Sequence, residues 1–171
     1  MGKIIGMVLV LGGIAGGLFQ WMEIQKEKQH RIEEFCVFLH KSIFRMESER
    51  IKVIDYFANY VSRDQRITEA LQEISKRLSQ NIYPDGQSVW EEVLNEMDWN
   101  LDLDKETYAV ILKSGNGFFG RNREENISFL KKQLEELERQ QVKSKEKDAK
   151  ERKVWVPVGM LSGVMLVLLF L

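Results

Sequence analysis

Residues 32–46 read IEEFCVFLHKSIFRM, and this stretch decides the class of fold. Its large apolar side chains recur at steps of three and four residues, at Ile32, Phe35, Leu39, Ile43 and Met46. Such steps place side chains on one face of an α-helix, whereas a half-buried strand alternates at every second residue. The stretch therefore predicts an amphipathic helix that packs its apolar face against other helices.

Further apolar stripes predict helices at 52–61 and 67–79, after Ser88, after Asp104 and from Asn122 onward. The helix at 52–61 is expected to bury Val53, Ile54, Phe57 and Val61. The last stripe has heptad spacing, at Ile127, Leu130, Leu134 and Leu137. About six helices with short connections predict an all-α fold, an antiparallel helical bundle.

Two uncharged apolar runs flank this bundle. Residues 4–22 read IIGMVLVLGGIAGGLFQWM, and residues 154–171 read VWVPVGMLSGVMLVLLFL. A helix of about 19 residues is about 28 Å long, close to the thickness of a bilayer's hydrocarbon core. A cleaved signal peptide is the alternative for the first run, but no small-residue cleavage site follows it. We therefore expect a transmembrane helix at each end.

The sequence divides the chain into four parts. An N-terminal transmembrane helix at 1–22 and a C-terminal one at 154–171 enclose a cytoplasmic bundle at 23–141 and a charged helical stalk at 142–153. Lys and Arg accumulate between the two runs, mainly in the stalk, and only Lys3 precedes the first run, which predicts that the bundle is cytoplasmic. The net charge of −1 and the alternating signs of the stalk argue against nucleic-acid binding.

Small residues four apart mark both terminal runs, at Gly12, Gly13, Gly16, Gly17, Gly159 and Gly163. Glycines at this spacing let two membrane helices approach closely, because packing drives their association in lipid. We expect these glycines to be packing positions. Their partner is either the other terminal helix of the same chain or a second membrane protein, a further copy of this chain included.

Two motifs resemble binding sites without meeting their requirements. Gly115, Gly117 and Gly120 have the spacing of a dinucleotide loop, but that loop must follow a strand, so we predict a tight connection between helices. Residues 98–102 begin like an EF-hand, but the sixth position holds Leu103 instead of glycine. We therefore predict no metal and no cofactor. The sequence contains no recognisable pair of nucleophile and base, so we predict that the protein is not an enzyme.

Helix starts are predicted at two places in the bundle. Ser88 followed by Glu91 fits a capping box, in which the serine caps the helix and the glutamate reaches back. Asn122 is expected to cap the last helix. The lone cysteine, Cys36, lies among apolar residues and is expected to be a buried, unreactive thiol.

The chain resembles the stage III sporulation protein AB family of endospore-forming bacteria. The local matches are GNGFFGRNREENISFLKKQLEEL at 115–137, Trp90 with the following EEVL, and the glycine-containing final run. Residues 43–51 depart from the family, which carries a Thr-Pro-Leu turn there.

This resemblance implies a bundle similar to the F-domain platform proteins of type II secretion systems. It implies a non-catalytic subunit of the channel complex between mother cell and forespore, in the mother-cell membrane around the forespore. The implied partners are the other channel subunits, including the cytoplasmic ATPase, stage III sporulation protein AA, together with the lipid bilayer. A free-standing membrane-anchored adaptor for a cytoplasmic regulator is the alternative.

Overall fold

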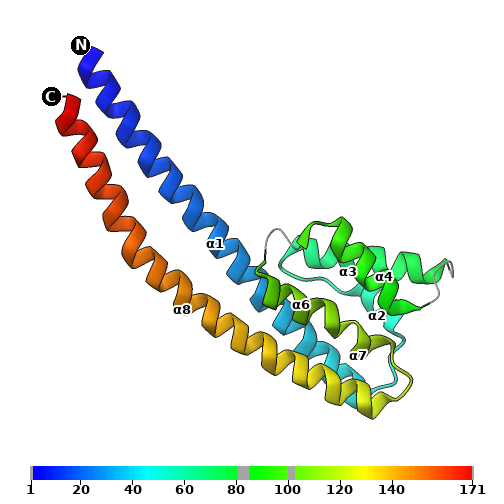
Figure 1. Cartoon of the computed structure of the whole chain (residues 1–171). Coiled ribbons are helices and arrows are strands. Elements are labelled where there is room, and N and C mark those ends of the chain that lie inside the picture. The colour runs from blue at the N-terminus through cyan, green and yellow to red at the C-terminus, as the bar shows by residue number, and fades with distance from the viewer. Residues whose placement is uncertain (1, 81–84, 100–102, 171) are drawn as a thin grey trace. The chain divides into compact units, whose positions relative to one another are not determined.

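The computed structural model describes residues 2–80, 85–99 and 103–170, without the side chains of 2–11, 14–15, 163, 166–167 and 169–170. Every regular element in these ranges is a helix, which confirms the all-α prediction. In chain order (Figure 1) they are α1 (Gly2–Ser48), α2 (Val53–Asn59), α3 (Gln65–Ser79), α4 (Gly86–Glu96), α6 (Lys105–Ser114), α7 (Asn116–Phe119) and α8 (Arg123–Phe170).

The chain forms two compact units. Residues 30–142 make up one, here called the bundle unit, and residues 1–29 with 143–171 make up the other, the terminal unit. Helices α1, of 47 residues, and α8, of 48 residues, are long enough to contribute to both units.

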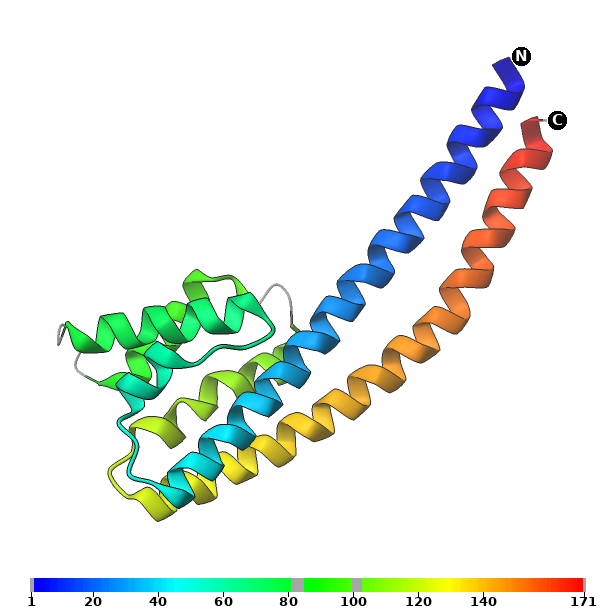
Figure 2. The same ribbon diagram turned by 180° about the vertical axis from the view of Figure 1, so that it is seen from behind.

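In the bundle unit, α1 and α8 run side by side in opposite directions (Figures 1 and 2). The Lys131 ammonium lies 2.6 Å from the Glu47 carboxylate, and His40 Nε2 lies 3.0 Å from Glu138 Oε1. These contacts fix the antiparallel direction, because the residue numbers rise in one helix as they fall in the other. Helices α2, α3, α4 and α6 pack on one side of this pair.

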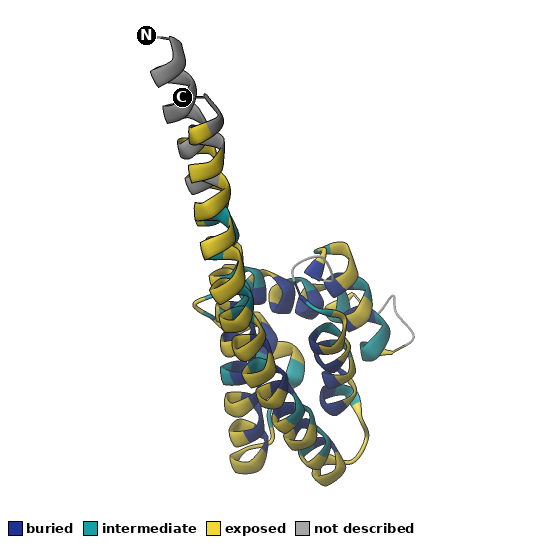
Figure 3. Ribbon diagram, turned by 60° about the vertical axis from the view of Figure 1, so that its left-hand side comes forward, coloured by how far each residue is buried: buried dark blue, intermediate teal, exposed yellow. Residues whose placement is uncertain are grey.

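Aromatic rings form the centre of the bundle unit. The Phe38 ring lies 5.8 Å from Phe57 and 5.5 Å from Phe118, measured between ring centroids. Trp90 is fully buried, lies 6.0 Å from Phe57, and donates from Nε1 to the carbonyl of Ile111 at 3.1 Å. Figure 3 shows buried residues gathered between the helices. Cys36 is buried, as predicted. The apolar stripe of residues 32–46 is also buried at each of its positions: Ile32, Phe35, Leu39, Ile43 and Met46.

The prediction for α2 is partly wrong. Phe57 is fully buried, but Ile54 is 38% exposed and Val61 is 74% exposed. The cause is the end of the helix: α2 stops at Asn59, and Tyr60 has an extended backbone with φ −76° and ψ 131°. The chain therefore leaves the helical path before Val61, whose side chain turns to solvent while that of Tyr60 turns inward.

A buried polar cluster ties α1 to the start of α3. The Arg31 guanidinium lies 3.1 Å from the Asp64 carboxylate, and each side chain is only 9% exposed. The same Asp64 caps α3 by accepting the backbone N–H of Arg66 at 2.9 Å. One turn further along α1, the Glu34 carboxylate accepts the hydroxyl of Ser62 at 2.9 Å. Asp64 thus provides both the ion pair with α1 and the N-cap of α3, so the start of α3 is held against α1.

Arg123, the first residue of α8, stabilises the end of α1 in the bundle unit. Its Nε donates to the carbonyl of Met46 at 2.7 Å, and its Nη2 donates to the carbonyls of Glu47 at 3.0 Å and Glu49 at 3.3 Å. The last carbonyls of a helix lack partners within the helix and carry its negative dipole end. The Arg123 guanidinium donates hydrogen bonds to these carbonyls, and its positive charge interacts favourably with the negative end of the helix dipole.

We expect Arg123→Ala to lower the free energy of unfolding by about 1–3 kcal/mol, because several charge-assisted bonds are lost together. Denaturant unfolding of the full chain in detergent, followed by circular dichroism, measures the change. Arg121→Ala is the matched control, since Arg121 is exposed next to the same helix start. Equal effects of the two substitutions would show that Arg123 does not stabilise the helix end.

The terminal unit is an antiparallel helix pair. Gln29 Nε2 donates to Ser144 Oγ and to Asp148 Oδ2, both at 2.8 Å. Helix α8 continues without interruption through the charged residues 143–153 and through Pro157. Within the part of the chain whose side chains are described, no helix offers a stretch that is both long and apolar enough to cross a membrane. The two flanking transmembrane helices remain a prediction.

Candidate interaction surface

The glycines of the 115–120 motif lie where helices approach closely. Gly115 has a helical backbone, and α7 occupies residues 116–119, so the expected loop contains a short helix. A Cβ atom on Gly115 would lie 2.7 Å from the Trp90 ring, and one on Gly117 would lie 2.5 Å from Leu130 Cγ. A bulkier residue would displace these buried side chains, so the motif serves packing in the bundle unit.

Asparagines complete this corner at the start of α8. Asn122 Oδ1 accepts the backbone N–H of Glu124 at 3.0 Å, and its Nδ2 donates to Glu125 Oε1 at 3.0 Å. Asn126 Nδ2 donates to the carbonyl of Gly120 at 2.9 Å, which holds the incoming chain against the first turn of the helix. The Asn122 side chain thus caps α8 through the backbone N–H of Glu124.

The predicted capping box at Ser88 requires a correction. Helix α4 begins at Gly86, and Asp85 is its N-cap, with its carboxylate accepting the backbone N–H of Ser88 at 2.7 Å and the hydroxyl of Ser88 at 3.0 Å. Ser88 therefore lies inside the first turn, and Glu91 accepts from Gln87 at 2.6 Å instead of reaching back. A carboxylate, which can accept both bonds, occupies the cap in place of the hydroxyl.

The terminal glycines differ in their surroundings within the terminal unit. A Cβ atom on Gly159 would lie 3.1 Å from Leu18 Cδ1, so this glycine faces α1 closely. A Cβ atom on any of the other four described glycines would meet no described atom within 4 Å: Gly12, Gly13, Gly16 and Gly17. Gly163 lies outside the described side chains. At these four positions of α1, a side chain would find space that no described atom occupies.

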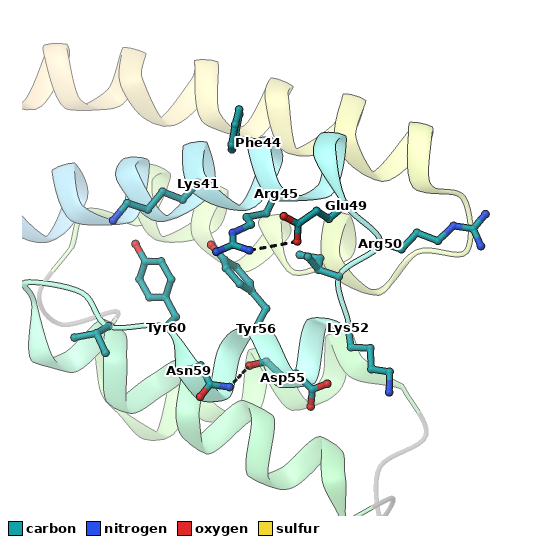
Figure 4. Close-up of a pocket in the computed structure, with 12 residues that line it drawn as sticks. Lys41, Phe44, Arg45, Glu49, Arg50, Lys52, Asp55, Tyr56, Asn59 and Tyr60 are labelled. Carbon is teal, nitrogen blue, oxygen red and sulfur yellow. Dashed lines mark hydrogen bonds and ion pairs between the residues drawn. The ribbon is translucent and has the colours of Figure 1, made fainter.

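An open groove of about 550 Å³ lies between the end of α1 and α2 in the bundle unit (Figure 4). The figure shows α1 contributing Lys41 and Arg45 and α2 contributing Tyr56, with Tyr60 directly after it. Two apolar side chains of the lining are well exposed, Phe44 at 68% and Val61 at 74%. The groove is therefore an apolar surface edged with charge, which is a common composition of protein interaction sites.

Basic side chains outnumber acidic ones in the groove. Its cations are Lys41, Arg45, Arg50 and Lys52, and its carboxylates are Glu49 and Asp55. One of these carboxylates is engaged already, because Arg45 Nη1 lies 3.3 Å from Glu49 Oε2. The Lys41 ammonium lies over the Tyr60 ring, 5.6 Å from its centroid. The site therefore has a positive potential, with cations and aromatic rings in contact.

Tyr60 is buried to 7% exposure, yet its hydroxyl has no hydrogen-bond partner among the described residues. Burial, together with the nearby Tyr56 and Glu34, raises the pKa of Tyr60 well above its ordinary value of 10.0. Burial likewise raises the pKa of Tyr56, although a bond from Ser42 and the charge of Arg45 oppose that shift. Both phenols therefore stay protonated in the folded chain.

These raised pKa values predict a loss of stability in alkali. Above pH 10 the unfolded chain ionises its tyrosines while the folded chain keeps Tyr60 protonated, so unfolding becomes more favourable as pH rises toward the folded pKa. We expect Tyr60→Phe to lose less stability than the wild type between pH 9 and about pH 11. Denaturant unfolding at each pH measures the difference, and parallel losses in the two proteins would contradict it.

The described residues contain no group of three or more His, Cys, Asp or Glu side chains placed to hold a metal ion. Residues 100–102 of the EF-hand-like stretch lie outside the described ranges. Of the two histidines, His40 contacts Glu138 on the surface of the bundle unit. The strongest candidate site is accordingly the groove, which sequence patterns did not single out because its residues come from two helices and the turn after them.

Comparison with known proteins gives one result. The family model of stage III sporulation protein AB matches residues 3–171, which is nearly the whole chain. Neither the curated proteins nor the solved structures give a significant match. Because the family model covers well over half of the chain, the protein belongs to the stage III sporulation protein AB family and is a protein of stage III of sporulation.

Proposed function

We propose that this chain is a non-catalytic platform subunit of the channel complex between mother cell and forespore. The observation that carries the proposal is the match to the sporulation family over residues 3–171, which includes both apolar ends as well as the helical bundle. A bundle with a membrane anchor at each end would hold a cytoplasmic partner at the membrane from two points. It would dock the cytoplasmic ATPase, stage III sporulation protein AA, and contact the other membrane subunits.

Exposed apolar side chains support a membrane location for the ends. On α8 a succession of large apolar residues is more than half exposed: Val154, Trp155, Met160, Leu161, Val164, Met165 and Leu168. On α1, Phe19 is 65% exposed. A contiguous apolar surface of this kind is rare on proteins that face water only, and it marks contact with lipid or with another protein. We infer that the two ends lie in the mother-cell membrane around the forespore.

The distribution of basic residues supports a cytoplasmic bundle. Six lysines and arginines lie within residues 143–153, next to the final apolar run, whereas Lys3 is the only one before the first run. Lys and Arg close to membrane helices are retained on the cytoplasmic side. The bundle unit, with its groove, would then face the compartment in which an ATPase operates.

A deletion strain with complementation tests the proposed function. We expect deletion to block endospore formation at the stage at which forespore gene expression depends on the channel, and the full chain to restore it. A second complementing gene should encode residues 23–153 alone, without the apolar ends, and should fail to restore it. Normal sporulation of the deletion strain would refute the proposal, and full rescue by the shortened chain would refute the membrane role of the ends.

A further inference from the structure

The hydroxyl of Tyr60 is one of several buried polar groups for which the fold provides no hydrogen-bond partner among the described residues. Buried polar groups in proteins almost always have a hydrogen-bond partner, and each exception needs a reason. Tyr60 Oη is buried and has no partner among the residues that the structure describes. The Tyr60 ring itself is well packed, 5.0 Å from Phe38 and 5.7 Å from Tyr56 between centroids. A phenylalanine would pack equally well, so folding does not require the hydroxyl.

The Tyr60 hydroxyl lies at the groove beside the Lys41 ammonium. Figure 4 shows Tyr60 and Lys41 pointing toward one another across the gap between α2 and α1. The Lys41 ammonium lies 5.6 Å from the centroid of the tyrosine ring. Since burial raises the pKa of Tyr60, its hydroxyl keeps a proton to donate. A donor and an ammonium side by side form a site for a carboxylate, which accepts from both.

The acidic groups that the structure describes near Tyr60 do not fill this site. Glu34 faces Tyr60 from α1, but its carboxylate accepts the hydroxyl of Ser62 at 2.9 Å and the backbone N–H of Arg63 at 3.1 Å. Glu49 pairs with Arg45. The remaining carboxylate of the lining, Asp55, is exposed on α2. A carboxylate that reaches Tyr60 would therefore come from another molecule.

The apolar lining indicates what kind of molecule brings it. Phe44 and Val61 are mostly exposed, so the groove offers an apolar surface as well as a charged point. A free anion would leave that surface uncovered. A protein segment that carries an Asp or Glu between apolar side chains would cover it and neutralise the excess of cations.

We propose that the groove between α1 and α2 docks an acidic, partly apolar segment of a partner protein. A carboxylate of this segment accepts the hydrogen bond of Tyr60 Oη and pairs with the Lys41 ammonium, while its apolar side chains cover Phe44 and Val61. This inference rests on the proposed function, because it names the place on the bundle at which a platform subunit would hold a partner.

Site-specific photocrosslinking in sporulating cells tests it on the full chain. Benzoylphenylalanine replaces Val61 in the groove or, as the control, Val142, an exposed valine of α8 in the same unit. The crosslinked peptide is identified by mass spectrometry. We expect position 61 to capture a segment of another protein that contains an Asp or Glu within a few residues of the crosslink, and position 142 not to capture that segment.

Substitutions identify the groups responsible. Tyr60→Phe should reduce the crosslink at position 61 about tenfold, because a hydrogen bond to a carboxylate is lost. The same substitution should leave the thermal midpoint unchanged or raise it by about 2–4 °C, because an unsatisfied hydroxyl is removed. Lys41→Glu should reduce the crosslink at least about tenfold by repelling the carboxylate.

Tyr108→Phe is the matched control. The Tyr108 hydroxyl donates a hydrogen bond of 2.6 Å to Asn95 Oδ1, and neither residue lines the groove. It should lower the thermal midpoint slightly and leave the crosslink unchanged. A lower midpoint for Tyr60→Phe would show that its hydroxyl serves folding and would overturn the inference.

The remaining outcomes separate this inference from the proposed function. Capture of lipid, of a second copy of this chain or of a segment without acidic residues at position 61 would overturn the acidic docking site. Capture of channel proteins at position 142 only would also overturn it, while leaving the platform function standing. No crosslink at either position in cells that sporulate normally would count against both.

Discussion

Replacing Trp90 with alanine is expected to lower the free energy of unfolding by about 3–5 kcal/mol. Trp90 is fully buried, and its ring contacts those of Phe57 and Phe118, with centroids 6.0 Å and 5.7 Å away. The substitution leaves a large cavity and removes the hydrogen bond from the indole N–H to the carbonyl of Ile111, which also accepts the Ser114 hydroxyl at 2.6 Å. Because domains are stable by only about 5–15 kcal/mol, this loss threatens folding itself.

The matched comparison is Trp90→Phe, which keeps an aromatic ring in the core but loses the indole N–H. Its expected cost is about 1–2 kcal/mol, mainly for the missing hydrogen bond. Denaturant unfolding of the full chain in detergent measures both variants against the wild type. If Trp90→Ala costs no more than Trp90→Phe, the aromatic cluster does not hold the bundle together.

Replacing Asp64 with alanine is expected to lower the free energy of unfolding by about 3–5 kcal/mol. Two losses coincide at this residue. The buried Arg31 guanidinium loses the carboxylate 3.1 Å away, and α3 loses its N-cap, which accepts the N–H of Arg66 at 2.9 Å. Removing one partner of a buried ion pair is costly, because the remaining charge stays in a poorly solvated place.

The matched control for this prediction is Asp85→Ala. Asp85 is the N-cap of α4, as Asp64 is of α3, but it is exposed and its described bonds go to Ser88. Its removal should therefore cost clearly less than the removal of Asp64. The same unfolding experiment compares the two. Equal losses would mean that the pair between Arg31 and Asp64 contributes little beyond the cap.

Periodicity predicted the helices well, because each one buries a single apolar face. The stripe from Ile32 to Met46 is buried as expected, and α3 and α8 begin within two residues of their predicted starts. Helix ends were less predictable. The expected cap at Ser88 competes with Asp85, three residues earlier, and either can cap a helix. Val61 continues the apolar pattern of α2, although α2 ends at Asn59.

Contacts between distant parts of the sequence could not be predicted from local patterns. Arg31 and Asp64 are 33 residues apart, and Arg123 and Met46 are 77 apart. The groove depends on the same kind of information, because Lys41 comes from α1 and Tyr60 from the turn after α2. Tyr60 falls within the helix predicted at 52–61, and the sequence pattern assigns it no role. Only the packed structure shows that its ring is buried while its hydroxyl lacks a partner.

We propose that this chain holds the ATPase of the channel complex at the mother-cell membrane. The most direct measurement is the fraction of that ATPase, stage III sporulation protein AA, recovered with membranes from sporulating cells with and without this chain. We predict that the ATPase moves from the membrane fraction to the soluble fraction when the chain is deleted, and that the full chain restores it. An ATPase that stays on the membranes in the deletion strain would contradict the claim.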